Sequence, residues 1–221
     1  GDGPEDGYTC SGLLSMPYEN KNNISADYGW HQMVLHPDGT VTAWGSDSYD
    51  QNIVPDDLSD VVAISSGQFH NLALHSNGTV TAWGGDVYGN GQTDVPDALS
   101  DVVAISAGER HNFALKSDGT VVHWGLTEFN LQVPDGLSDV VAIETYKWTG
   151  LALKSDSTVV AWGYNTYGGA TVPGGLTDAI AVASGEYHSL ALRSDGTVMG
   201  WGRNNYSQLD PEYSCGSCTR Y

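Results

Sequence analysis

The sequence predicts an all-β fold, a β-propeller of five four-stranded blades with about 39 residues in each repeat. A Trp-Gly dipeptide recurs five times, and a short turn sequence and a proline recur with the same period. The tryptophans of these dipeptides are Trp44, Trp83, Trp124, Trp162 and Trp201, with separations of 39, 41, 38 and 39 residues. The prolines that bound the five units are Pro17, Pro55, Pro96, Pro134, Pro173 and Pro211. Because three kinds of marker share one period, we interpret the chain as a repeat protein.

A turn tripeptide precedes every Trp-Gly dipeptide. It is Asp-Gly-Thr at 38–40, 118–120 and 195–197, Asn-Gly-Thr at 77–79, and Asp-Ser-Thr at 156–158. The Asn-Gly pair supplies the positive φ angles that a tight hairpin needs. Each tripeptide therefore predicts a hairpin between the second and third strands of its unit.

The second unit shows how each repeat divides into strands. Residues 61–64 are rich in β-branched side chains and predict the first strand, followed by strands at 71–74 and 80–83. Residues 93–95 predict a short fourth strand, since the following Pro96 is tolerable at a sheet edge. No stretch shows a sustained 3.6-residue apolar period, so helices should be nearly absent.

The middle strands are apolar on both faces. Leu-Ala-Leu recurs at 72–74, 151–153 and 190–192, and Val-x-Ala-Trp recurs at 41–44 and 80–83. A blade that packs between two neighbouring blades needs apolar residues on both sides, whereas a sheet with one solvated face alternates more regularly. A radial arrangement is therefore predicted. A linear solenoid is the alternative, for which polar terminal repeats would be expected.

The charge of the chain limits its partners. It carries 27 acidic and 8 basic residues in 221, a formal net charge of −19. A polyanion repels phosphate backbones, so we expect no binding of nucleic acid or of anionic lipid. The longest apolar runs are far too short to span a bilayer, so no membrane insertion is expected. The acids occur singly, mostly as aspartates in turns, which indicates a solvated surface.

The two ends differ from the repeats. We divide the chain into an N-terminal segment, 1–16, with Cys10, a five-repeat propeller, 17–211, and a C-terminal tail, 212–221, with Cys215 and Cys218. Cysteines confined to the ends suggest a disulfide that joins them in an oxidising compartment, so we expect an extracellular protein. Cys10 is predicted to pair with Cys215 or Cys218. One cysteine then remains, which favours an intermolecular bond and self-association.

The repeats resemble those of the regulator of chromosome condensation family. Residues 185–192, Gly-Glu-Tyr-His-Ser-Leu-Ala-Leu, and 108–115 are similar to the family's Gly-x-x-His-Ser-Leu-Ala-Leu strand. The short period and the Gln-Thr-Asp-Val-Pro segment at 92–96 resemble secreted bacterial members, such as the propeller-type β-lactamase inhibitory protein. Eukaryotic members catalyse nucleotide exchange on a small GTPase through an inserted loop, and no such insertion is found here.

Two departures from the family pattern stand out. Family propellers usually have seven blades, whereas this chain has five units, so the sequence leaves ring closure open. The fourth unit is degenerate, because Tyr-Lys-Trp-Thr at 146–149 replaces Gly-x-x-His and Ser157 replaces the turn glycine.

One repeat position is occupied by large side chains in all five units. These residues, each preceding the repeat's His or Thr, are Trp30, Phe69, Arg110, Trp148 and Tyr187. They fall in the loop between the first two strands, so all should lie on one face. Such residue types dominate interface energetics, and the resemblance implies that aromatics here meet a partner protein. A protein-binding face and partial burial under neighbouring loops both remain open.

Two other series are interpreted as structural. His31, His70, His111 and His188 share a repeat position and should hydrogen-bond locally, since equivalent atoms of successive blades lie too far apart to bind one metal ion. A second aromatic series, regular in every unit, suggests packing; it comprises Tyr49, Tyr88, Phe129, Tyr167 and Tyr206. No catalytic, cofactor or metal site is predicted, because no motif for one occurs.

These observations favour a non-enzymatic extracellular structural or scaffold protein that self-assembles into a filament or surface layer. The alternative is a secreted protein-binding module or enzyme inhibitor that uses one propeller face. The expected partners are accordingly a second copy of the chain or another extracellular protein. An enzyme is the third class, and no acid–base or nucleophile constellation supports it.

Overall fold

The computed structural model describes residues 23–26 and 31–209, and the regular secondary structure of this part consists of β-strands alone. The strands form five three-stranded antiparallel sheets in chain order. The strands of the first three sheets are β1 (Ile24–Ser25), β2 (His31–Leu35) and β3 (Val41–Gly45), then β4 (Val61–Ser66), β5 (His70–His75) and β6 (Val80–Gly84), then β7 (Val102–Ala107), β8 (His111–Lys116) and β9 (Val121–Gly125). The last two sheets contain β10 (Val140–Tyr146), β11 (Thr149–Lys154) and β12 (Val159–Gly163), then β13 (Ala179–Ser184), β14 (His188–Arg193) and β15 (Val198–Gly202).

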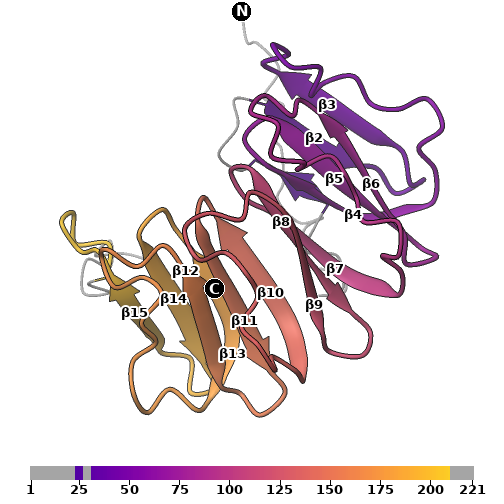
Figure 1. The fold of residues 1–221 in the computed structure, drawn as a ribbon. Helices are drawn as coiled ribbons and strands as arrows, with labels where there is room; N and C mark the ends of the chain where they lie inside the picture. The colour runs from indigo at the N-terminus through magenta and orange to yellow at the C-terminus, as the bar shows by residue number, and fades with distance from the viewer. Residues whose placement is uncertain (1–22, 27–30, 210–221) are drawn as a thin grey trace, which may run out of the picture.

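The sheets follow one another as blades along an open arc (Figure 1). First strands of successive sheets contact one another, as do the second strand of one sheet and the first strand of the next. The third strand of each sheet has its main contacts with the second strand of the same sheet. Within residues 23–26 and 31–209, the first and last sheets make no extensive contact, so this part of the chain does not close a ring.

Each described sheet has three strands, so the prediction of four-stranded blades is wrong. The expected fourth strand, 93–95, forms turns instead: the amide of Asp94 donates to Gly91 O and that of Val95 donates to Thr93 O. These amides are used locally, and Pro96 has no amide hydrogen to donate. The segment therefore connects two sheets without pairing with a neighbouring strand.

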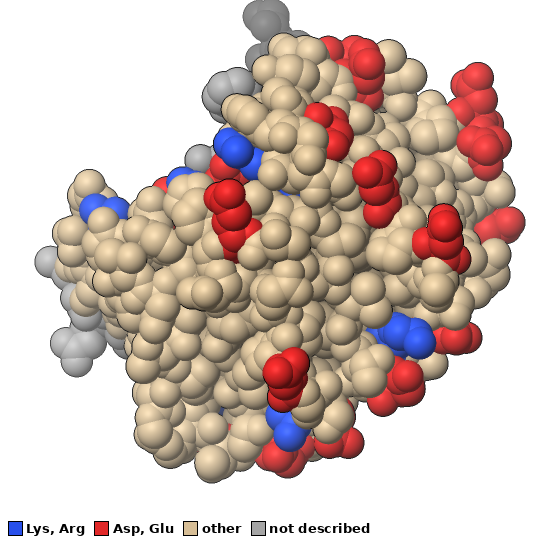
Figure 2. Space-filling model, viewed as in Figure 1, with Lys and Arg blue, Asp and Glu red and all other residues tan. Residues whose placement is uncertain are grey.

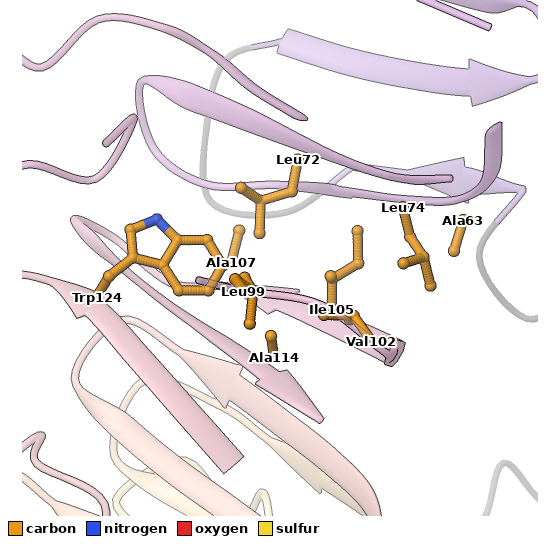
Figure 3. Close-up of a cluster of buried hydrophobic side chains, with 9 residues drawn as sticks. All are labelled: Ala63, Leu72, Leu74, Leu99, Val102, Ile105, Ala107, Ala114 and Trp124. Carbon is orange, nitrogen blue, oxygen red and sulfur yellow. The ribbon is translucent and has the colours of Figure 1, made fainter. Parts of the chain in front are cut away.

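The apolar core lies between the sheets. Leu72 and Leu74 of β5 point across the second junction toward Val102 and Ile105 of β7, and Trp124 of β9 completes this cluster (Figure 3). Equivalent clusters fill the other three junctions. In the three interior sheets, apolar side chains on both faces of the middle strand are thus buried by a neighbour on each side. Because the sheets also follow an arc, the arrangement agrees with the predicted radial one.

The first strand begins with a bulge in the second to fifth sheets. In β4 the register with β5 shifts between Val61 and Ala63, and Val62 between them is exposed. The corresponding exposed residues are Val103, Val141 and Ile180. The bulge turns one apolar side chain outward while its neighbours remain in the junction.

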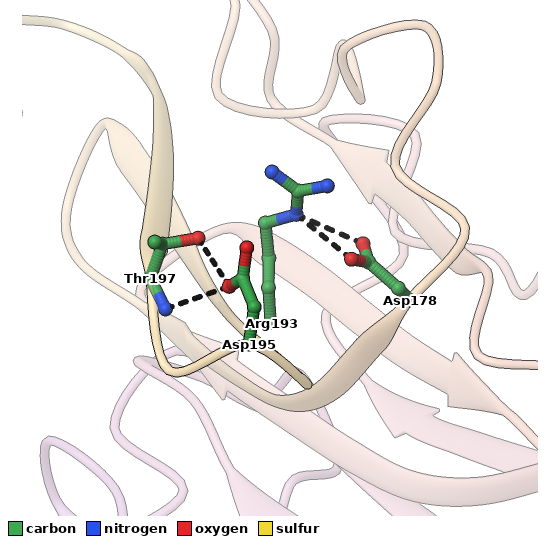
Figure 4. A network of polar contacts seen from close by, with 4 residues as sticks. All are labelled: Asp178, Arg193, Asp195 and Thr197. Carbon is green, nitrogen blue, oxygen red and sulfur yellow. Dashed lines mark hydrogen bonds and ion pairs between the residues drawn. The ribbon is translucent and has the colours of Figure 1, made fainter.

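The turn tripeptides form the predicted hairpins. In the last sheet, the amide and hydroxyl of Thr197 both donate to Asp195 Oδ1, at 2.9 and 2.6 Å (Figure 4). Beside this turn, Arg193 Nε donates to both carboxylate oxygens of Asp178, at 2.9 and 3.1 Å. In the Asn-Gly hairpin only Gly78 has a positive φ, 80°. The glycine alone therefore supplies the left-handed conformation.

The acids are scattered over the face shown in Figure 2 and do not gather in one patch. Several belong to the hairpin turns, where the threonine hydrogen bonds lower the pKa of Asp38, Asp118, Asp156 and Asp195. Within the described residues, no helix has the length and apolar character needed to cross a bilayer.

Candidate functional site

Two sets of loops meet at one end of the sheets. In the second sheet, His70 at the start of β5 pairs with Gly84 at the end of β6. The loop before β5 and the loop after β6 are therefore neighbours, and the other sheets repeat this register. The first aromatic series lies in the former loops and the second series in the latter. We call the surface that they form the aromatic face.

The first part of the aromatic face is centred on Phe69. Its ring centroid lies 4.8 Å from that of Tyr49 and 6.4 Å from that of Tyr88, which belong to loops of two successive sheets. The guanidinium carbon of Arg110 lies 3.7 Å from the centroid of the Tyr88 ring. A cation over an aromatic ring at this distance is attracted by the negative face of the ring.

The second part of the aromatic face is a larger group of rings. Trp148 stacks on Phe129 with centroids 4.8 Å apart, and both rings meet Tyr164 edge-on. Tyr187 lies 6.2 Å from Tyr164 and 4.8 Å from Tyr167. Five rings from three successive units thus form one continuous group.

Charged side chains accompany this second group. Lys147 Nζ pairs with the carboxylate of Glu186 and lies 4.7 Å from the Trp148 centroid. Arg203 lies 5.1 Å from the Tyr167 centroid and 5.4 Å from that of Tyr187. The hydrogen bond from Lys147 lowers the pKa of Glu186. These contacts fix long side chains and so reduce the conformational entropy that a partner must remove on binding.

A buried carboxyl group lies close to the same loops. Glu109 is buried, its Oε1 lies 3.3 Å from Arg110 Nη2, and its backbone amide donates to Lys147 O of the next sheet. Burial raises the pKa of this carboxyl group. Glu109 and Lys147 therefore join the two parts of the aromatic face.

The structure brings four of the five predicted face residues to this end of the sheets: Phe69, Arg110, Trp148 and Tyr187. Trp30 lies outside the described residues. Phe69 is only 9% exposed because Tyr49 and Tyr88 cover it, whereas the other three are partly exposed. Phe69 is thus buried under neighbouring loops, which was one of the two interpretations, and a protein-binding role for the exposed residues stays a prediction.

Four members of the second aromatic series pack, as predicted, and they pack on rings of the first series: Tyr49, Tyr88, Phe129 and Tyr167. All five members nevertheless stay exposed. Exposure ranges from 38% for Phe129 to 83% for Tyr206. Its members therefore belong to the surface. Tyr164, Arg203 and Lys147 were not predicted from the sequence, although the residue type at their repeat positions differs from unit to unit. Position 164, for example, corresponds to Ser46, Gly85, Leu126 and Arg203 in the other units. Variation at one repeat position was the available signal.

Three of the four histidines, His31, His70 and His111, are fully buried, and they bond to the next sheet and not locally as predicted. His188 is only partly buried. His31 Nε2 lies 2.7 Å from Asn71 Oδ1, His70 Nε2 lies 2.6 Å from Asn112 Oδ1, and His111 Nε2 lies 2.9 Å from Thr145 Oγ1. Burial lowers the pKa of His70 to about 4 and that of His111 well below its usual value. Among the described residues, no cluster of three or more His, Cys, Asp or Glu side chains is arranged to hold a metal ion. Cys10, Cys215 and Cys218 lie outside the described residues, so their pairing stays a prediction.

Comparison with known families identifies three of the five units. Residues 61–90, 102–130 and 179–208 match the regulator of chromosome condensation (RCC1) repeat. The degenerate fourth unit is not among the matched segments. A comparison with curated protein sequences gives no match.

Several solved structures share the fold. Prp20p from Saccharomyces cerevisiae, described with its binding to Gsp1p and histones, is 23% identical with a TM-score of 0.69; the match covers 84% of this chain and 58% of that one. The ectodomain of the Physcomitrella patens receptor kinase CR4 is 22% identical with a TM-score of 0.65, covering 81% and 49%. Human WBSCR16 is 21% identical with a TM-score of 0.66, covering 82% and 61%. This chain spans about half to three fifths of the length of these structures.

Proposed function

This chain carries repeats of the regulator of chromosome condensation family and forms a β-propeller arc, and we propose that it is a non-catalytic protein-binding module that uses its aromatic face. One observation carries the proposal: rings and cations from successive units form a continuous, partly exposed surface at one end of the sheets. Tyr, Trp and Arg are the residue types that most often dominate binding energy in protein interfaces.

The charge of the chain favours a particular partner. With a net charge of −19, the chain attracts basic proteins over long range and repels acidic ones. We propose a partner with a basic surface around an apolar centre that meets Trp148 and Tyr187. Prp20p, which shares the fold, binds Gsp1p and histones, and this supports protein binding as a use of the fold.

An extracellular setting is part of the same proposal, supported by cysteines confined to the two ends of the chain. An inhibitor of a secreted enzyme is one form that such a module can take. A direct probe is a purified β-lactamase, whose hydrolysis rate is measured with increasing amounts of this protein. Inhibition that is lost in Trp148→Ala supports the inhibitor form, and an unchanged rate excludes inhibition of that enzyme.

Three baits test the proposal in general: the native chain, the double variant Trp148→Ala with Tyr187→Ala, and the control Val103→Ala. Val103 is apolar and more exposed than Trp148 or Tyr187, but it lies at the start of β7, at the opposite end from the aromatic face. Each bait is used for affinity capture from extracellular fluid, followed by quantitative mass spectrometry and direct titration of the captured protein.

We expect a basic protein that binds the native chain and Val103→Ala and binds the double variant at least about tenfold more weakly, since hot-spot truncations cost more than about 1 kcal/mol each. Circular dichroism and thermal unfolding must show that the double variant is folded. Equal binding by all three baits would contradict the proposal.

A further inference from the structure

The first sheet exposes apolar side chains whose equivalents in the second sheet are buried. Trp44 is 47% exposed, whereas its repeat equivalent Trp83 is 7% exposed. Ile24 is 72% exposed, whereas the equivalent Ile64 is 2% exposed. Ile64 and Trp83 are covered by Met33 and Leu35 of the preceding sheet. Ile24 and Trp44 thus form a receiving surface on which none of the described sheets packs.

The last sheet exposes the other half of the same interface. Leu72 and Leu74 in the second sheet are buried by the next sheet, and Leu151 and Leu153 in the fourth sheet are buried in the same way. Their equivalents in β14, Leu190 and Leu192, are partly exposed. At the interior junctions, this Leu-x-Leu surface packs on the first strand and the tryptophan of the following sheet. The last sheet presents the same surface.

Polar contacts at the interior junctions are also repeated. Ser25 Oγ lies 2.7 Å from Ser66 Oγ and accepts the Ser66 amide hydrogen at 2.9 Å, across the first junction. The same contact joins Ser65 to the amide of Ala107 at the next junction. By repeat position, Ala183 in the last sheet corresponds to Ser25, and Ala26 in the first sheet corresponds to Ser66. These two alanines would face each other if the last sheet packed on the first.

We propose that the last sheet of one copy of this chain docks on the first sheet of a second copy, through Leu190 and Leu192 on one side and Ile24 and Trp44 on the other. A second copy is the occupant that the structure favours, because the same pair of surfaces already packs at four junctions between successive sheets. The contact is independent of the proposed function, since it uses no residue of the aromatic face.

The proposed contact joins unlike surfaces, so each copy keeps one free end of each kind. Such a head-to-tail contact produces a ring if the rotation closes and a helical filament if it does not. This inference gives the self-association expected from the sequence a specific interface.

Sedimentation velocity over a range of protein concentrations tests the assembly. We expect the native chain to shift from 23.5 kDa to larger species as concentration rises. Ile24→Asp and Leu192→Asp each place a charge in the contact and should shift the association to at least about tenfold higher concentration, since a buried unpaired charge is costly. Val103→Asp adds the same charge to an exposed apolar site on the first strand of the third sheet and should leave the association unchanged.

Disulfide trapping tests the geometry. One preparation carries only Ala26→Cys and the other only Ala183→Cys, so that a bond between positions 26 and 183 in their mixture must join two molecules. We expect peptide mapping to find this bond in the mixture. A control mixture replaces Ala183→Cys with Ser155→Cys, which places a thiol on an exposed hairpin of the fourth sheet, and should lack an equivalent bond.

Three results would overturn the proposal. The first is a uniform 23.5 kDa monomer at all concentrations, which would mean that residues 1–22 or 210–221 of the same chain, or another protein, occupy these surfaces. The second is a larger species that Ile24→Asp and Leu192→Asp leave unchanged. The third is a dimer trapped by Ala26→Cys alone, which would show pairing of like ends. Each result leaves the aromatic-face test unaffected.

Discussion

At the scale of single residues, the hairpin turns show how local chemistry fixes backbone conformation. The aspartate or asparagine of each tripeptide accepts from the threonine two positions later, and the residue between them has a positive φ, from 65° to 84°. Four units use glycine at this central position. The fourth unit has Ser157, whose Cβ makes the same conformation unfavourable by about 1–2 kcal/mol.

Ser157→Gly should therefore stabilise the protein. The relief of strain exceeds the extra chain entropy that glycine loses on folding, for a net gain of about 0.5–1 kcal/mol in the free energy of unfolding. Chemical denaturation measures the change. The matched reverse substitution is Gly196→Ser in the fifth unit, where an added Cβ meets no other atom within 4 Å, and it should destabilise by a similar amount. A lower unfolding free energy for Ser157→Gly would contradict this account of the turn.

At the scale of strands and sheets, the stability of a strand depends on the sheets on both sides of it. Leu72 and Leu190 occupy the same repeat position in the same kind of strand, and their neighbours in sequence are nearly the same. Leu72 is fully buried by the following sheet, whereas Leu190 is partly exposed. The two leucines therefore compare an occupied junction with an unoccupied one inside a single molecule.

Leu72→Ala should cost about 2–5 kcal/mol of unfolding free energy, because it leaves a cavity in a packed junction. Leu190→Ala should cost less than half as much when it is measured on dilute monomer. Urea unfolding of both variants, followed by circular dichroism, gives the comparison. Equal costs would show that the end of the arc is covered in the monomer.

At the scale of the whole molecule, the junctions share one polar element that responds to pH. Buried histidines bond from one sheet to the next at the first three junctions, and burial lowers the pKa of His31, His70 and His111. The unfolded chain binds a proton on such a histidine near pH 6.5, whereas folded His70 does so only near pH 4. The stability that this group contributes is complete above pH 6.5 and is lost as the pH falls toward 4.

Because of His70, the unfolding free energy should therefore fall by up to about 1.4 kcal/mol per pH unit between pH 6.5 and 4, and His31 and His111 should act in the same direction. The aspartates of the hairpin turns become protonated only below this pH range, because their hydrogen bonds with threonine lower their pKa values. Glu109 opposes the trend as the pH falls toward 4.5, since its raised pKa lets the folded chain bind a proton before the unfolded chain does.

Urea unfolding at a series of pH values from 7.5 to 4 measures this change. The unfolding free energy should fall less steeply with pH for His70→Gln than for the native chain. His36→Gln is the control, because His36 bonds to Thr42 within its own hairpin and not to another sheet. An unfolding free energy that stays constant between pH 6.5 and 4 would exclude buried neutral histidines as the cause.

The repeat, the hairpins and the apolar residues of the junctions could all be predicted from the sequence. Each leaves a signal inside one unit: Gly78 permits its turn, and the apolar pattern of 72–74 indicates that both faces of the strand are covered. The number of strands in a described sheet, the open arc and the union of two aromatic series in one surface follow from the three-dimensional packing of the units and could not be predicted. Whether residues 93–95 pair with a strand depends on a neighbour's free edge, and ring closure depends on the angle that successive junctions add. The contact of Trp148 with Phe129 depends on how the sheets sit against one another, which no single repeat encodes.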